Sequence, residues 1–182
     1  MKGVLSAALG SRLAADRRGV AAVEFAMTVP VLIMVYIAGF EVSQAMATYR
    51  KVSDTTIELA NIAAQYTTIG TADSTSIMNA SSQIMAPYST QNLTIVLSEI
   101  TTDANNNAKV TWSEPYNGAT ALPQNSAITL PSGLATPNTN YILIQTTYLY
   151  NPVTGTTLVP SIPMTDQIYM LPRASPSIPF TG

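Results

Sequence analysis

The stretch Val20–Phe40, VAAVEFAMTVPVLIMVYIAGF, decides the fold of this chain. It contains 21 residues, and Glu24 is the only charged residue among them. An α-helix of that length spans about 31 Å, which is enough to cross the hydrocarbon core of a bilayer. The stretch therefore predicts a transmembrane helix over residues 20–40. The alternative, a buried core helix of a soluble protein, fits the length of the apolar run less well.

Charged residues are distributed unevenly on the two sides of this stretch. Four basic residues precede Val20 against one acidic residue, whereas four basic and nine acidic residues occur from Val20 onward. Positive charge marks the cytoplasmic side of a membrane helix. The pattern predicts a cytoplasmic basic leader at 1–19 and an extracytoplasmic remainder. The protein would then be single-pass in the inner (cytoplasmic) membrane, with its C-terminal domain periplasmic.

The composition argues against several classes of function. The chain has no cysteine and no histidine, the residue types that supply most metal ligands and general bases. The formal net charge is −2, and this gives no reason to expect nucleic-acid binding. We therefore expect no enzyme, no cofactor and no metal. A membrane-tethered enzyme that uses carboxylates stays open as an alternative.

Glu24 is the informative residue of the apolar stretch. A carboxylate costs a few kcal/mol at the centre of a bilayer and less near its surface. Ionisable residues inside a membrane are therefore functional candidates. The alternative is that Glu24 lies at headgroup depth beside Arg17 and Arg18, where it would cost little.

The segment Arg17–Phe25, RRGVAAVEF, resembles the processing site of TadE-like pilin proteins of the Tad (tight adherence, Flp-type) pilus. The resemblance implies cleavage by a prepilin peptidase after Gly19, so that Glu24 becomes the fifth residue of the mature chain. The residues it implicates are Arg17, Arg18, Gly19 and Val20 for processing, and Glu24 and Phe25 for processing or assembly. The two arginines also allow a twin-arginine export signal, but the surrounding consensus is absent.

The same resemblance implies a structural role in pilus assembly, as a minor pilin or pseudopilin. The implied partners are other Tad/Flp pilins, TadE-, TadF- or TadG-like minor subunits, the prepilin peptidase, the inner-membrane assembly platform and membrane lipid. With 182 residues, the chain is expected to resemble TadE or TadF more than the larger TadG-like proteins.

A removed signal peptide is the main alternative to this interpretation. Ala45-Met46-Ala47 offers a small-residue cleavage site after a basic start and an apolar run. Cleavage near Ala47 would release a soluble, secreted binding protein. Against this, the apolar run is long for a signal, and the helical pattern continues beyond it.

The helical pattern extends past the membrane segment. Mostly apolar residues recur at spacings of three and four, which predicts one helix from Val20 to Tyr66; they are Val42, Ala45, Tyr49, Val52, Thr56, Leu59, Ala63 and Tyr66. Gly70 is expected to cap its end, and a second short helix is expected over Asp73–Ala86. Residues 41–90 would thus form an extracytoplasmic helical part.

After residue 90 the apolar period changes to two. Strands are predicted at Asn92–Thr101, Ala108–Glu114, Asn140–Tyr150 and Asp166–Pro172. The first two form a hairpin around the polar turn Asp103–Asn107, whereas 119–140 and 151–164 are expected to be loops. Residues 91–175 would form an antiparallel sheet and 176–182 a flexible tail. The fold class is therefore α+β: a long N-terminal helix, membrane-spanning in its first half, packed on a small antiparallel sheet in a pilin-like arrangement.

Few side chains outside the helix suggest chemistry. Glu99 and Glu114 could approach each other across the hairpin, but a solvated strand face is expected. Trp112 and Tyr116 could contact a sugar, but packing against the sheet or against another subunit is expected.

Overall fold

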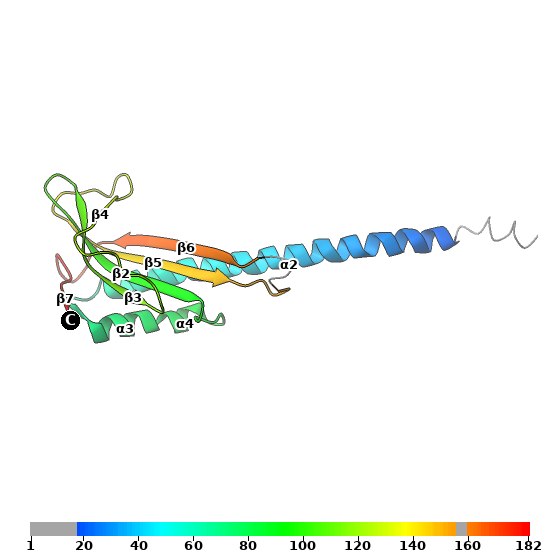
Figure 1. Cartoon of the computed structure of the whole chain (residues 1–182), viewed down its shortest axis with the longest axis horizontal. Coiled ribbons are helices and arrows are strands. Elements are labelled where there is room, and N and C mark those ends of the chain that lie inside the picture. The colour runs from blue at the N-terminus through cyan, green and yellow to red at the C-terminus, as the bar shows by residue number, and fades with distance from the viewer. Residues whose placement is uncertain (1–17, 156–159) are drawn as a thin grey trace, which may run out of the picture. The chain divides into compact units, whose positions relative to one another are not determined.

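The computed structural model describes residues 18–155 and 160–182 and divides into two compact units, Met1–Ser43 and Gln44–Gly182 (Figure 1). The predicted α+β class is confirmed: one long apolar N-terminal helix is followed by an antiparallel sheet. Helix α2, Arg18–Ala63, is continuous through Pro30. The leader expected at 1–19 lies almost entirely outside the described residues.

The second unit contains the C-terminal part of α2 and the shorter helices and strands that follow it in the chain. They are β1 Ile69–Gly70, α3 Thr71–Asn79, α4 Ser81–Met85, β2 Leu93–Thr102, β3 Ala108–Tyr116, β4 Ala127–Ile128, β5 Asn140–Tyr150, β6 Ile162–Met170 and β7 Phe180–Thr181. Five of the strands form one antiparallel sheet in the order β4-β3-β2-β5-β6, and β1 pairs with β7 in a separate parallel pair.

The predicted hairpin is present as β2 and β3. In the turn, Asp103 Oδ1 accepts hydrogen bonds of 2.8 Å from the backbone N–H groups of Asn105 and Asn107. Asn106 has a φ of 64°, a conformation that asparagine tolerates better than most residues. The ladder shifts its register between Glu99 and Ile100, which marks a β-bulge. β5 occupies the predicted range.

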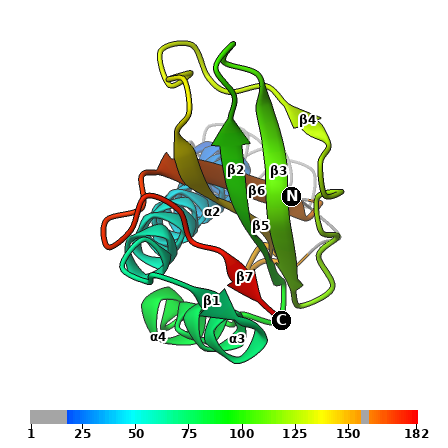
Figure 2. The same cartoon turned by 90° about the vertical axis from the view of Figure 1, so that its left-hand side faces the viewer.

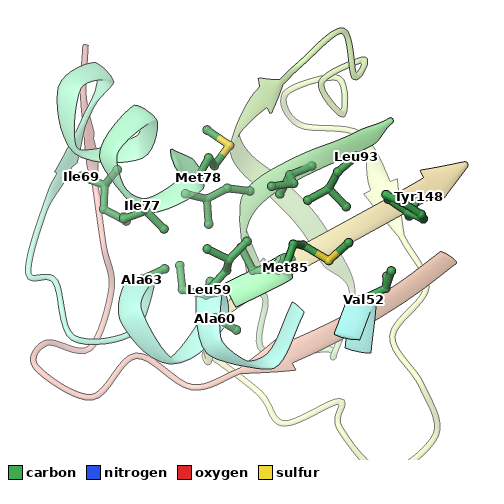
Figure 3. Close-up of a cluster of buried hydrophobic side chains, with 14 of the residues drawn as sticks. Val52, Leu59, Ala60, Ala63, Ile69, Ile77, Met78, Met85, Leu93 and Tyr148 are labelled. Carbon is green, nitrogen blue, oxygen red and sulfur yellow. The ribbon is translucent and has the colours of Figure 1, made fainter. Parts of the chain in front are cut away.

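The main core lies between one face of the sheet and the helices of the second unit. Figure 3 shows Val52 and Leu59 of α2, Met85 of α4 and Leu93 of β2 among its buried side chains. The helical stripe predicted from the sequence is confirmed at Val52, Thr56, Leu59 and Ala63, all fully buried. It is wrong at two positions, because Val42 and Tyr49 are exposed.

Buried threonine hydroxyls on α2 also face this core. Thr56 Oγ1 bonds the carbonyl oxygen of Val52 and lies 2.5 Å from Thr146 Oγ1 of β5, while Thr55 Oγ1 donates to Lys51 O. Buried polar groups cost free energy unless they are hydrogen-bonded. These bonds let α2 approach the sheet closely without leaving polar atoms unsatisfied.

A second, smaller core covers part of the opposite sheet face. Ile100, Val110, Tyr141 and Leu143 form it together with residues of the connection from β3 to β5. This connection was predicted to be a loop, and β4 is the only strand that the described part of it contains.

Helix α2 ends three residues before the predicted Tyr66. The bonds Gln65 N to Ile62 O and Tyr66 N to Ala63 O, both 3.1 Å, tighten the last turn, and Arg173 N caps Ala64 O at 2.8 Å. The predicted C-terminal cap at Gly70 is therefore wrong. Gly70 belongs to β1, where an added Cβ would lie 3.1 Å from the backbone oxygen of Thr181.

The segment predicted as one short helix is two helices, because Ala80 interrupts it. Ala80 N bonds Ile77 O and Ser76 O, and Gln83 N returns to Ala80 O at 3.0 Å, which makes a tight turn between α3 and α4. Asp73, where the predicted helix began, lies in the first turn of α3, and its Oδ2 accepts a hydrogen bond from Gly70 N at 3.0 Å.

Strand β6 begins four residues earlier than predicted and includes Pro163. Proline cannot donate to a ladder, so its presence favoured a loop. However, β6 is an edge strand, and its outer side needs no partner. Pro163 therefore pairs with Leu149 at the edge without breaking the sheet.

The C-terminal residues, expected to be a flexible tail, are packed. Figure 2 shows β7 beside β1 and next to α3. Ile178 is fully buried, and Pro179 O accepts a hydrogen bond from Ile69 N at 3.1 Å. The expectation was wrong because these contacts join residues more than a hundred positions apart, and a local sequence pattern does not reveal them.

Candidate functional site

The predicted processing and assembly residues lie at the start of α2. Arg17 lies outside the described residues, and Arg18 is the first residue of the helix. Gly19 and Val20 follow in the first turn, and a Cβ added to Gly19 would meet nothing within 4 Å. Glu24 and Phe25 lie about one turn further along.

The side chains of residues 20–40 are exposed almost throughout. Phe25, Met27 and Tyr36 are each more than 70% exposed, and the other large apolar side chains of the stretch are exposed as well, except that of Val29, which is partly buried. Within residues 18–155 and 160–182, α2 is the one helix long and apolar enough to cross a membrane, by length and composition. So much apolar surface in water is unfavourable, and burial in lipid removes the cost.

The polar groups of this segment are partly satisfied inside the helix. Thr28 Oγ1 donates to the carbonyl oxygen of Glu24 at 2.8 Å, and Ser43 Oγ donates to Gly39 O at 2.9 Å. Such internal bonds allow hydroxyls to enter lipid without an unpaired donor. The Glu24 carboxylate is exposed and lies on the same helix face as Val20, four residues before it.

A second acid, Glu99, is buried in the sheet domain. Its Oε1 accepts the backbone N–H of Ile178 at 2.7 Å, and its Oε2 accepts Trp112 Nε1–H at 3.1 Å. Trp112 Nε1–H also donates to Ile178 O at 2.8 Å, and the Trp112 ring lies 5.4 Å from that of Phe180. Glu99 thus fastens the C-terminal segment to the sheet.

The solvated face expected for Glu99 is therefore wrong, and the sequence contained the signal. Leu93, Ile95, Leu97 and Glu99 alternate along β2, which places Glu99 on the core face. Burial raises the pKa of the Glu99 carboxyl, while the hydrogen bonds from Ile178 and Trp112 lower it by less.

The aromatic residues of the hairpin pack as expected. Trp112 is buried, and Tyr116 donates its hydroxyl to Asn79 Oδ1 of α3 at 2.8 Å. Glu114 pairs with Leu97 in the β2–β3 ladder, whereas Glu99 pairs with Trp112.

The hydrogen bonds of Glu99 are those of a structural contact. Both Glu99 oxygens accept N–H groups of the protein itself, and within residues 18–155 and 160–182 no group of three His, Cys, Asp or Glu residues could hold a metal ion. The fold and the apolar helix define a helix-anchored protein with an α+β domain.

Residues 19–61 match the family model of the TadE-like protein. The resemblance inferred from Arg17–Phe25 is thus confirmed, and the matched region begins at Gly19 and includes Glu24. The family is associated with the Tad pilus and is not known to be enzymatic. No curated protein matches the chain. No solved structure matches it either.

Proposed function

We propose that this protein is a minor pilin-like subunit in Tad pilus assembly, anchored in the inner membrane by residues 20–40. The leader 1–19 lies in the cytoplasm, and the helical part 41–90 and the sheet lie outside it. The observation that carries the proposal is the exposed apolar helix with its single acid, inside the region that matches TadE-like proteins.

Processing at Gly19 gives Glu24 a partner. Cleavage after Gly19 creates a positive α-amine at Val20, one helical turn from the Glu24 carboxylate. The amine neutralises Glu24 of its own chain or of an adjacent subunit. In an apolar bundle a charge without a partner costs several kcal/mol, so the pair favours the register in which both charges are matched.

Processing also requires a local opening of the helix. The bond between Gly19 and Val20 lies in the first turn of α2, where the N–H groups have no partner within the helix. Gly19 weakens this turn by about 1 kcal/mol relative to alanine. The first turn therefore opens at low cost, and the peptidase receives an extended substrate. Arg17 and Arg18 hold the leader at the cytoplasmic face.

The partners we propose are other Tad/Flp pilins, TadE-, TadF- or TadG-like minor subunits, the inner-membrane assembly platform and the prepilin peptidase. The peptidase acts on this chain, which has no catalytic role of its own. The family match supports an association with the Tad pilus in general, and these particular partners extend it.

N-terminal sequencing of the protein purified from membranes tests the proposal. We expect a mature chain that starts at Val20 in cells with the prepilin peptidase and an uncleaved chain in cells without it. The variant Gly19→Val should remain uncleaved in cells with the peptidase. An added Cβ at this position meets no neighbour within 4 Å, so the loss of cleavage would not reflect misfolding. A soluble product starting at Thr48 would instead support a secreted binding protein, and the pilin proposal would fail.

A further inference from the structure

Exposed apolar side chains gather at the end of the sheet domain where β5 turns into β6. We call this surface the hairpin-tip patch; it consists of Val153, Ile162 and Pro163 from the β5–β6 hairpin and Met46 and Tyr49 from α2. Val153 is 69% exposed and Met46 is 55% exposed. A groove of about 440 Å³ runs between Met46 and Tyr49 on one side and Ile162 and Pro163 on the other, so the helix and hairpin parts adjoin.

The hairpin-tip patch carries little charge. No charged residue occurs in the sequence from Asn151 to Thr165, and Arg50 is the charged residue that lines the groove. About a quarter to a third of a typical soluble surface consists of charged residues. An exposed surface that is apolar and uncharged is typical of a protein–protein or membrane contact.

The chain itself keeps the patch close to a bilayer. This step rests on the proposed function, which places residues 20–40 in the membrane. Met46 follows Phe40 by six residues, which span at most about 21 Å when fully extended and about 9 Å as a helix. Headgroups extend the bilayer by about 5–7 Å beyond each side of its hydrocarbon core. Connectivity alone therefore brings the membrane surface within reach of the patch.

The opposite end of the sheet lies a full strand length away from the hairpin-tip patch. In Figure 1 the β5 arrow ends far from β4, and the Asp103–Asn107 turn belongs to the β4 end because Thr101 of β2 pairs with Asn140 at the start of β5. Strand β2 alone measures about 33 Å at 3.3 Å per residue. The 103–107 turn is also polar, with Asp103 fully engaged by Asn105 and Asn107.

We propose that the hairpin-tip patch docks on the outer surface of the membrane, at the boundary between lipid headgroups and acyl chains. Tyr49 suits this boundary because its ring is apolar and its hydroxyl is polar. Arg50 reaches phosphate groups while its aliphatic stem covers the apolar groove. Val153 and Ile162 enter the acyl boundary from the hairpin. The sheet domain is then held against the bilayer by a second contact besides the helix.

Fluorescence quenching in vesicles tests the docking with the full-length chain. The protein has no cysteine, so single cysteines can be introduced and labelled with an environment-sensitive dye at Val153, Ile162, Asn105 and Ile33. Each variant is reconstituted in phosphatidylcholine vesicles with or without lipid that carries a quencher near the headgroup or deep in the acyl chain. Trp112, the only tryptophan, reports whether each variant is folded.

The Ile33 label reports the proposed membrane span independently of the patch. We expect the deep quencher to quench Ile33, and the shallow quencher to quench Val153 and Ile162 several-fold more than Asn105. If the label at Ile33 is quenched but the labels at Val153 and Ile162 are quenched no more than the label at Asn105, the docking is refuted and the proposed membrane span is supported. Labels at the patch that are shifted to an apolar environment but unquenched would show a protein partner, which also refutes lipid docking. An unquenched Ile33 would refute the membrane span and the docking with it.

Discussion

At the scale of single residues, Glu99 and Glu24 differ in how the charge of their carboxylates can be compensated away from water. Glu99 is taken out of water by the fold and receives two N–H donors from Ile178 and Trp112. Glu24 stands on an exposed apolar helix, and its carboxylate is proposed to find its partner only after cleavage. A carboxylate that is buried in protein or exposed to lipid costs free energy unless hydrogen-bond donors or a positive charge compensate it. Each of the two residues therefore requires such a partner.

Replacing Glu99 by glutamine should destabilise the sheet domain. Both oxygens of a carboxyl group can accept a hydrogen bond, but the nitrogen of an amide cannot, so glutamine leaves one of the two N–H groups without an acceptor. We expect Glu99→Gln to lower the free energy of unfolding by about 1–3 kcal/mol at pH 5. Urea unfolding followed by Trp112 fluorescence measures this change. Glu58→Gln, at an exposed site on α2, is the matched control and should change stability by less than about 0.5 kcal/mol. Equal effects of the two variants would contradict a structural role for Glu99.

The raised pKa of Glu99 makes this difference depend on pH. Because the folded protein binds the Glu99 proton more tightly than the unfolded chain does, protonation stabilises the fold. The contribution is complete below the ordinary glutamate pKa of about 4.3 and is lost as pH rises through the higher folded-state pKa. We expect the stability gap between wild type and Glu99→Gln to narrow from pH 4 to pH 7. A gap that widens with pH would mean that burial does not dominate at this carboxyl.

At the scale of elements, the C-terminal segment is the clearest test of packing. Ile178 is fully buried, so Ile178→Ala should lower the free energy of unfolding by about 2–5 kcal/mol. Thr181→Ala, at an exposed position of β7, should have little effect. Amide exchange adds a second readout, because the Ile178 N–H donates to the buried carboxylate of Glu99 and should exchange slowly. A flexible tail would show neither the loss of stability nor the slow exchange.

The elements also show which parts of the fold the sequence could predict. β5 was predicted with its observed bounds because NYILIQTTYLY is rich in β-branched and aromatic residues and contains no breaker. The apolar stretch was predicted for a similar reason, since hydropathy is a local property. Pro163 misled the prediction of β6 because local sequence does not say which strand lies at an edge. The β1–β7 pair is two residues long and joins the ends of the domain, which no local pattern encodes.

The candidate functional residues can also be divided into those that local sequence could predict and those that it could not. Arg17 to Phe25 could be recognised because the basic, glycine and acidic positions are adjacent in sequence, and the family match includes Gly19, Glu24 and Phe25. The contacts of Glu99 could not be predicted from the sequence, because Ile178 lies 79 positions from Glu99. The hairpin-tip patch was missed because it combines exposed residues of α2 with those of a hairpin more than a hundred residues later.

At the scale of the whole molecule, the N-terminal helix is proposed to serve two purposes, insertion into the membrane and assembly with other subunits. The proposed insertion of residues 20–40 into lipid depends on their apolar side chains, and one carboxylate near the start of the stretch contributes little to that burial. Assembly, by contrast, is proposed to depend on the charge of Glu24 and its match with an amine. Insertion and assembly should therefore respond differently to the same substitution.

Glu24→Ala should leave the protein in the membrane fraction but reduce its processing or its incorporation into pili. Losing a buried charge pair costs about 3–5 kcal/mol when one partner remains, and each 1.4 kcal/mol is a tenfold change in an equilibrium. We expect a fall of more than tenfold in incorporated subunit, measured by immunoblotting of sheared pili against the membrane fraction. Val23→Ala, one position earlier, removes apolar surface without removing charge and should behave as wild type.

N-terminal sequencing of the membrane-bound Glu24→Ala protein then separates the two steps: a start at Val20 assigns the defect to assembly, and an intact leader assigns it to processing. Normal pili from Glu24→Ala would refute the role given to this acid, because no other charged residue lies between Val20 and Phe40 to replace it.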